Sequence, residues 1–375
     1  MKICAIICEY NPLHNSHAMQ IATAKQITNC DLLVCLMSGN YVQRGEPAIF
    51  DKYTRSRHAI FAGADAVIEL PIFSAIGSAD DFALGAMRIL KALNVAAICF
   101  GCENDSLLQL QQTADILYNE NIDTSNIIKQ SLSNGNNYAT AVAQTLSTID
   151  CNILNKPNNL LAVSYIKAAK KLNFETEFYP IKRLGDYNDT SISSAHPSAS
   201  AIRNAINLGF DVSNTIPHYV YNDIKNFLPQ REYERFVHLY LQTLTADSLS
   251  NIYGVSEGIQ NRIEKCKKAS DYTSFFASLK TKRYTRLKLN RILLNAVLNI
   301  TNNVQNEYKS IPPYSRLLAI KKINVTALMP IFAACSLLNS PPSSLNIIEN
   351  NANNLYWALS PKSEKSNNNI SKYIY

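Results

Sequence analysis

Short, continuously apolar runs alternate with helical patterns through the first half of the chain. The first run, ICAIIC at residues 3–8, is followed by the helical pattern HAMQIATAKQI. The same alternation continues through DLLVCLM, AVIEL, VAAICFG and ETEFYPI. A strand that is buried on both faces of a sheet has an unbroken apolar sequence. Parallel strands are usually joined by helices. The sequence therefore predicts an α/β fold, with a Rossmann-like domain whose parallel sheet is covered by helices.

The pattern changes near Asn214, where strand-like runs disappear and helical patterns dominate. We expect two domains, one over residues 1–212 and a mainly α-helical one over residues 213–375. The polar end of the chain, SPKSEKSNNNISKYIY, is predicted to be a loose tail.

Charge and cysteine content narrow the class of protein. The net charge of +7 and pI near 8.8 fit a polyanionic partner without requiring one. Most of the nine cysteines lie inside apolar runs and form no CxxC pair, which is typical of free thiols in a reducing compartment. The N-terminal sequence becomes polar too early for a signal peptide, and no apolar run has transmembrane length. We expect a cytoplasmic protein that does not enter membranes.

His14 and His17 stand three residues apart at the start of the first predicted helix. They could be a metal pair, two ordinary polar residues at a helix start, or a cradle for phosphate. No third ligand lies at metal-binding spacing, so the metal interpretation is weak. The turn after the first strand lies at the ligand-binding edge of a parallel sheet, and a helix N-terminus binds anions. This context favours the phosphate cradle, because two imidazoles on one turn can donate hydrogen bonds to a leaving pyrophosphate.

Other polar residues are predicted at the same edge. The loop SGNYVQRGEPA follows the second strand, and its turn residues and polar side chains favour ligand contact. Arg55 and Arg57, in the next helix, are expected to be solvated or to meet RNA phosphates. Gly101 ends a strand and would leave room for an adenine or ribose, although it could be a simple strand-end glycine. Arg183 follows the fifth strand, where a guanidinium suits a phosphate, while Lys182 should face elsewhere.

Two helix starts carry further candidates. Of Asn158 and Asn159, one is expected to cap the helix and the other to enter the site. In SASAIR, Ser198 and Arg203 form either a phosphate-binding helix start or a capping serine with a solvated arginine.

The segment KTKRYTRLKLNR has six basic residues, no acidic ones, and Tyr284 and leucines between them. A helix of this pattern can pack by its apolar stripe and present cations to RNA phosphates.

The quoted motifs resemble a known family. EYNPLHNSHAMQ resembles the signature of the HxGH nucleotidyltransferases, which transfer AMP from ATP, with Ser16 where that signature usually has glycine. Together with MSGNYVQRGEPAIFDKYTRSRHAIFAGADAVIELP, it resembles the bacterial tRNA(Met) cytidine acetate ligases. The segments FGCEND, PNNLLAVSYIKA, IKRLGDYND, SASAIR and TKRYTRLKLNRILL agree in the same order.

The resemblance implies an ATP-dependent ligase that forms acetyl-adenylate and acetylates the N4 amine of the wobble cytidine of elongator tRNA(Met). It implies ATP and acetate as substrates, Mg²⁺ with the ATP, no dedicated metal site, and an ATP-binding first domain followed by a tRNA-binding second one. The alternatives are a small-molecule adenylyltransferase of the same superfamily and a non-catalytic RNA-binding protein. The expected catalytic residues are His14 and His17. The expected ATP-binding residues are Ile7, Cys8, Glu9, Tyr10, Asn11, Pro12, Leu13, Asn15, Ser16, Gln20, Gly101, Asn158, Arg183, Ser198 and Arg203. The expected tRNA-binding residues are Arg44, Lys280, Lys282, Arg283, Arg286, Lys288 and Arg291.

Overall fold

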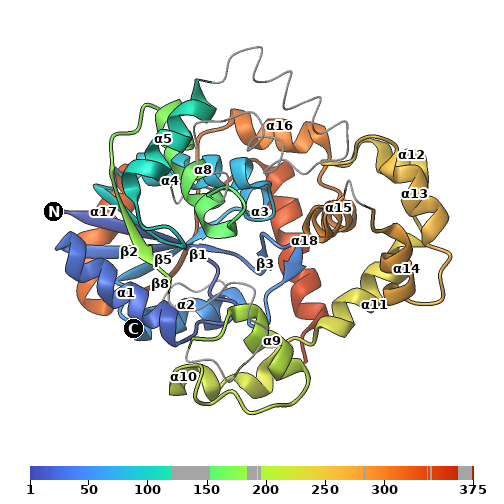
Figure 1. The fold of residues 1–375 in the computed structure, drawn as a ribbon, viewed down its shortest axis with the longest axis horizontal. Helices are drawn as coiled ribbons and strands as arrows, with labels where there is room; N and C mark the ends of the chain where they lie inside the picture. Colours follow the sequence, from blue (N-terminus) through green and yellow to red (C-terminus); the bar gives the residue numbers. More distant parts are fainter. Residues whose placement is uncertain are drawn as a thin grey trace.

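The computed structural model describes residues 1–119, 153–183, 192, 196–281, 284–335, 337, 340–361 and 374–375. Its central element is a six-stranded sheet in the order β7-β6-β1-β2-β5-β8 (Figure 1). The strands are β1 (Ile3–Cys8), β2 (Leu32–Ser38), β5 (Ala66–Leu70), β6 (Ala97–Cys102), β7 (Glu177–Lys182) and β8 (Leu317–Ile320). The first five are parallel and correspond to the five apolar runs, so the predicted α/β fold is confirmed.

The order of the strands identifies the ligand-binding edge. The chain runs outward from β1 through β2 to β5, and then returns to the other side of β1 to form β6 and β7. The switch point therefore lies between β1 and β6. In open α/β sheets, ligands bind outside the carboxyl ends of the strands at such a point.

Helices cover both faces of this sheet. Alternate residues of β1 face opposite sides, with Ile3, Ala5 and Ile7 in one apolar cluster and Cys4 and Ile6 in another. The first cluster includes α4 (Ala79–Ala92), α5 (Leu107–Tyr118) and α8 (Pro157–Lys171). The second includes α1 (Asn15–Thr28), α2 (Lys52–Phe61) and α9 (Ala199–Asn207). The short helix α3 (Ile72–Ala75) follows β5.

The rest of the chain is mainly helical and has a third apolar cluster of its own. Helices α11 to α15 lie together on the side of the molecule away from α1 (Figure 1). The helical elements after α9 are α10 (His218–Tyr221), η1 (Ile224–Asn226), α11 (Gln230–Leu241), α12 (Ala246–Ser250), α13 (Ile259–Cys266), α14 (Tyr272–Leu279), α15 (Arg286–Leu298), α16 (Asn302–Ser310), η2 (Lys322–Asn324), α17 (Val325–Ala334) and α18 (Ser343–Leu359).

The expectation that strands disappear after Asn214 is wrong. Strand β8 pairs antiparallel with β5, with Ala66 opposite Ile320, and α17 packs Leu328 and Phe332 into the first cluster. The run LLAI is only four residues long and stands among helical patterns, so its period could not identify it. The division between residues 212 and 213 stays a prediction.

Two smaller features complete the fold. A two-stranded hairpin, β3 (Tyr41–Val42) and β4 (Glu46–Pro47), lies within the loop after β2 and was not predicted. Most of the tail that was predicted to be loose, residues 362–373, falls outside the described residues. The last residue is attached, since the Tyr375 N–H donates to the Ile320 carbonyl at 2.9 Å.

Candidate functional site

The turn between β1 and α1 places the two histidines at the switch point of the sheet. His14 is the N-cap of α1, and His17 lies in the first turn of that helix. Their rings are stacked, with centroids 3.6 Å apart and planes 18° apart. The backbone N–H of His14 donates to His17 Nδ1 at 3.4 Å, and the Tyr10 ring lies edge-on to His17 at 5.2 Å. The predicted pair is thus a single ordered unit.

Burial makes both imidazoles neutral. It lowers the pKa of His14 well below its usual value, with the neighbouring His17, Arg183 and His196 charges acting in the same direction. Burial, and then the Arg183 charge, lowers the pKa of His17 to about 3. A hydrogen bond to the Pro12 backbone opposes this lowering of the His17 pKa. Each neutral imidazole keeps one N–H, so the pair can donate hydrogen bonds without carrying a charge.

The N-terminus of α1 is only partly open to a ligand. The Asn15 N–H donates to the Thr215 carbonyl at 3.1 Å, and the Asn15 amide donates to the Asn214 carbonyl at 2.9 Å. The Ser16 hydroxyl lies 3.4 Å from His196 Nδ1. Fewer N–H groups at the start of α1 are therefore open to an anion than the sequence suggested.

Three predicted ATP-binding residues meet on the β6 and β7 side of the histidines. A Cβ placed on Gly101 would lie 3.5 Å from Gln20 Nε2 and 3.6 Å from Arg183 Cγ. These distances are ordinary van der Waals contacts, so a methyl group would fit beside Gly101 while touching both side chains. The Arg183 N–H donates to the Cys102 carbonyl at 2.9 Å, which continues the pairing of β6 with β7. Lys182 is more than half exposed and faces Asp105, as expected from alternation.

The two asparagines at the start of α8 do not cap it. The N-cap is Lys156, and the Asn159 side-chain oxygen instead accepts from the backbone N–H groups of Glu103 and Asn104 at 2.9 and 3.0 Å. The Glu103 carboxylate accepts from the Asn158 amide at 2.7 Å and from the Asn159 N–H at 3.0 Å. The capping prediction is wrong because a carboxylate from the β6 loop takes that role, and an ATP contact by Asn158 stays a prediction.

Helix α9 closes the other side of the turn. Ser198 is its N-cap and accepts from the Ala201 N–H at 3.1 Å. Arg203 donates to the Asn11 carbonyl at 2.7 Å and to the Ser200 hydroxyl at 3.2 Å, so it is not a solvated arginine. Arg44, predicted to contact tRNA, donates to the same Ser200 hydroxyl at 2.9 Å. Ser200 was not singled out from the sequence, although SASAIR contains it.

Glu9 lies directly after β1, beside three arginines. Its carboxylate accepts from the Gln43 N–H at 2.7 Å. Burial raises the pKa of Glu9, while the Gln43 N–H and the charges of Arg44, Arg203 and Arg55 oppose that rise.

Other residues of the predicted ATP set serve the core through their side chains. Tyr10 and Leu13 are buried in the cluster that includes α1, and the Asn11 side chain accepts from the Ile49 N–H at 2.9 Å. Ile7 and Cys8 end β1, and the Asn11–Pro12 peptide is cis. These residues shape the turn mainly with their backbone.

The prediction for Arg55 is wrong, while the one for Arg57 stays a prediction. Arg55 is 0 % exposed and donates to the backbone carbonyls of Glu9 at 2.6 Å, Ser38 at 3.1 Å, Phe50 at 3.0 Å and Gly39. Its guanidinium ties the ends of β1 and β2 together below the site. Arg57 pairs with Asp223 at 2.6 Å. The helix bearing them packs against the sheet, and carbonyl groups at the strand ends satisfy the buried cation.

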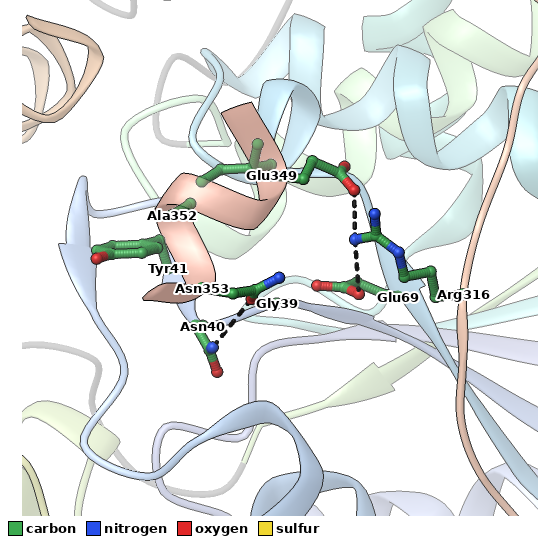
Figure 2. A pocket seen from close by; sticks show the side chains of 9 residues that line it. Gly39, Asn40, Tyr41, Glu69, Arg316, Glu349, Ala352 and Asn353 are labelled. Carbon is green, nitrogen blue, oxygen red and sulfur yellow. Dashed lines mark hydrogen bonds and ion pairs between the residues drawn. The ribbon is translucent and has the colours of Figure 1, made fainter. Parts of the chain in front are cut away.

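A small polar cavity lies at the carboxyl ends of β2 and β5 (Figure 2). Arg316 pairs there with Glu69 at 3.7 Å and with Glu349, and the Asn40 amide donates to Asn353 at 3.1 Å. The cavity is lined by Gly39, Asn40, Tyr41, Glu69, Ile72, Arg316, Glu349, Ala352 and Asn353. Its walls come from four distant parts of the sequence, so no local motif could have indicated it.

This polar cluster is balanced in charge. Lys52 binds Glu69 at 2.8 Å, and Tyr314 donates to Glu349 at 2.9 Å. With two cations facing two carboxylates, the cluster joins α18 to the sheet and offers no excess charge to an anion.

The basic segment is only partly helical. Helix α15 begins at Arg286 with Thr285 as its N-cap, and Lys280 is the C-cap residue of α14. Lys282 and Arg283 lie outside the described residues. The predicted apolar stripe of this segment packs only in part, because Tyr284 and Leu289 are buried while Leu287 is exposed.

The cations of α15 differ in exposure. Arg286 is exposed and lies 5.4 Å from the Phe276 ring, and Lys288 lies 4.5 Å above the Tyr284 ring. Arg291 is half-buried, and it donates to the Gln43 carbonyl at 3.4 Å. Of these three cations, Arg286 is the exposed one, and Lys288 and Arg291 are half-buried.

Within the described ranges, no group of three histidine, cysteine, aspartate or glutamate side chains is arranged to hold a metal ion. Among the helices that the structure describes, none has both the length and the apolar character needed to cross a membrane.

Comparisons with known proteins find relatives over nearly the whole chain. Residues 1–369 match the family described as HIGH Nucleotidyl Transferase. The chain is 34% identical to the tRNA(Met) cytidine acetate ligase of Oceanobacillus iheyensis, over 96% of each chain. It is 35% identical to the enzyme of the same name from Clostridium perfringens, again over 96% of each.

A solved structure shares the whole fold. The crystal structure of Thermotoga maritima TmcAL bound with alpha-thio ATP has a TM-score of 0.86 and 26% identity, covering 100% of this chain and 98% of that one. The same protein in its apo form has a TM-score of 0.89 and 27% identity, covering 97% and 96%.

Proposed function

This chain belongs to the tRNA(Met) cytidine acetate ligases of the HIGH nucleotidyltransferase family, and we propose from that premise that it acetylates a tRNA cytidine in two steps. ATP first activates acetate as acetyl-adenylate. The N4 amine of the wobble cytidine of elongator tRNA(Met) then takes the acetyl group. The ATP analogue bound by the Thermotoga maritima protein supports ATP as the nucleotide of this chain too.

The neutral, stacked pair His14 and His17 at the switch point carries this proposal. In the first step, an oxygen of acetate attacks the α-phosphorus of ATP, the bond from that phosphorus to the bridging oxygen breaks, and pyrophosphate leaves. Negative charge grows on the leaving group, and hydrogen bonds from preorganised neutral donors stabilise it. Positioning and charge stabilisation are sufficient for such a transfer, without a covalent enzyme intermediate.

The predicted ATP set is arranged to support this step. Gly101 has no side chain between Gln20 and Arg183 on the β6 side, where the nucleoside would lie. Arg183 is close enough to the histidines for its charge to lower their pKa values. A guanidinium there would neutralise phosphate oxygens. Arg203 and Ser198 would complete the phosphate side from α9. Mg²⁺ would enter as part of the ATP substrate, and no step is assigned to a protein-bound metal.

In the second step, the cytidine amine attacks the acetyl carbonyl carbon, the C–O bond to AMP breaks, and the amine loses one proton. The base must leave its stack to reach the adenylate. The exposed Arg286 and the neighbouring Lys288 and Lys280 would hold the tRNA backbone near the site. A tRNA substrate is consistent with the cytoplasm as the place of reaction.

The direct test is to incubate the protein with ATP, acetate and bulk tRNA and to look for N4-acetylcytidine by mass spectrometry. We expect acetylcytidine in elongator tRNA(Met), and acetate-dependent exchange of pyrophosphate into ATP without any tRNA. Exchange that needs another small molecule would indicate the adenylyltransferase alternative. Binding of tRNA without exchange or product would indicate a non-catalytic RNA-binding protein.

A further inference from the structure

The turn of the hairpin after β2, formed by Gln43, Arg44 and Gly45, lies between the helical part of the chain and the catalytic loop. Figure 1 shows strand β3 in the middle of the molecule, between the sheet and α18. The turn is closed by the Gly45 N–H, which donates to the Val42 carbonyl at 2.9 Å. The turn contacts backbone atoms of α15 on one side and polar groups of the catalytic loop and α9 on the other.

On the helical side, the turn lies directly on the backbone of α15. A Cβ on Gly45 would lie 2.4 Å from the Arg291 nitrogen and 2.6 Å from the Asn290 carbonyl carbon. The φ of Gly45 is +73°, a conformation that other residues adopt only with strain. Arg291 donates to the Gln43 carbonyl, and the Tyr233 hydroxyl of α11 donates to the Gly45 carbonyl at 3.4 Å. Only a glycine allows this approach.

On the catalytic side, the same turn holds the loop between β1 and α1. The Gln43 N–H donates to the Glu9 carboxylate at 2.7 Å. Arg44 and Arg203 both donate to Ser200, and Arg203 also donates to the Asn11 carbonyl. Glu9 and Asn11 lie on the loop that ends at His14. A displacement of the turn would therefore move the loop that carries the histidines.

We propose that the Gln43–Gly45 turn transmits the position of helix α15 to the adenylating loop, and that Arg291 is a positioning residue of that site instead of a tRNA contact. This inference rests on the proposed function, because it assigns Arg291 a role in the adenylating step. It separates the basic residues of α15 into two groups. Arg286, exposed at the first turn, meets tRNA, and Arg291, one and a half turns later, holds the hairpin.

Two variants test the contact from opposite sides, and each has a matched control. Gly45→Ala places a methyl group against the α15 backbone, while Gly258→Ala imposes the same backbone strain (φ +77°) where the nearest atom is 3.9 Å away. Arg291→Gln removes the hairpin contact, while Arg286→Gln removes an exposed cation from the same helix. Arg291→Lys keeps a donor and should restore most of the activity.

We expect Gly45→Ala and Arg291→Gln to lower acetate-dependent ATP–pyrophosphate exchange without tRNA by up to about 100-fold, since a misplacement near 1 Å can cost this much. Their tRNA affinity and its salt dependence should stay at the wild-type values. Gly258→Ala should exchange normally, and Arg286→Gln should bind tRNA more weakly than the wild type. Normal exchange in both hairpin variants, or an Arg291→Gln protein that loses tRNA affinity as Arg286→Gln does, would overturn the proposal.

The pH profile separates positioning from a general loss of structure. The groups facing Glu9 are the Gln43 N–H and Arg44 from the hairpin, Arg55 from α2, Arg203 from α9 and Tyr165 from α8. In this proposal, the Gln43 N–H holds the ionised Glu9 carboxylate. A shifted turn withdraws that N–H and removes one group that lowers the pKa of Glu9, so exchange in both variants should fall first on the acid side. A purely structural defect would lower exchange equally at every pH, and that result would contradict the proposal.

The test also separates this inference from the proposed function. A wild-type protein without any exchange would refute the proposed function. The inference would then be decided by calorimetric titration with ATP, in which Gly45→Ala and Arg291→Gln should bind ATP more weakly than Gly258→Ala. Equal affinities would overturn it.

Discussion

Replacing Arg55 tests whether a fully buried guanidinium holds the strand ends together below the site. In Arg55→Met the apolar stem keeps most of its volume, but the carbonyl groups of Glu9, Ser38, Gly39 and Phe50 lose their donor. A buried carbonyl left without a partner costs about 1–3 kcal/mol, and part of that cost is relieved when a buried cation is removed. We therefore expect a loss of about 3–5 kcal/mol, since the several orphaned carbonyls cannot all rotate toward water.

Thermal unfolding followed by circular dichroism measures this loss. At roughly 2 °C per kcal/mol for a chain of this size, Tm should fall by about 6–10 °C. The matched control is Arg57→Met in the same helix, whose ion pair with Asp223 is partly exposed and worth no more than about 1 kcal/mol. A Tm for Arg55→Met within about 2 °C of the wild type would refute the view that these carbonyls depend on Arg55.

Three further predictions concern the site and its surroundings. Burial lowers the pKa of His17 to about 3, below its unfolded value, so the free energy of unfolding should be highest above about pH 6.5 and should decrease as the pH falls toward 3. In urea titrations at several pH values, His17→Ala should weaken this pH dependence. An unchanged dependence of the unfolding free energy on pH would contradict the assignment. Replacing Arg286 and Lys288 with glutamine should weaken tRNA binding and reduce the slope of log K against log salt by roughly 0.7–0.9 for each lost phosphate contact, and an unchanged slope would exclude them as contacts. Glu103→Gln should cost about 1 kcal/mol in urea unfolding, because the carboxylate loses charge at the N-terminus of α8, and a variant as stable as the wild type would argue against that role.

The elements of the sheet could be predicted because buried parallel strands have a local signature. The five parallel strands are mostly apolar runs, although β5 contains Glu69 and β7 begins and ends with charged residues. The turns that follow them were placed at the carboxyl edge of the sheet. That placement favoured a phosphate cradle at His14 and His17, and the resemblance to the HxGH nucleotidyltransferases implied their catalytic role. Strand β8 was not predicted, because a run of four apolar residues is too short to distinguish a strand from a helix.

The features that sequence reasoning missed depend on contacts between distant segments. Whether Arg55 reaches water or the carbonyls of β1 and β2 depends on how α2 packs, and its helical pattern does not encode this. Asn159 looked like a cap because Glu103, the group that takes that role, lies more than fifty residues earlier in the chain. The approach of Gly45 to α15 likewise joins segments about 250 residues apart.

Acetate-dependent exchange of labelled pyrophosphate into ATP, without tRNA, tests most directly whether the neutral histidine pair performs adenylation. The wild type should exchange, and His17→Ala should lose about 100- to 1,000-fold, the usual cost of one donor to a developing anion. His218→Ala, which changes an exposed histidine on α10, should exchange like the wild type, and tRNA binding should survive in every variant. Full exchange in both His14→Ala and His17→Ala would contradict the account.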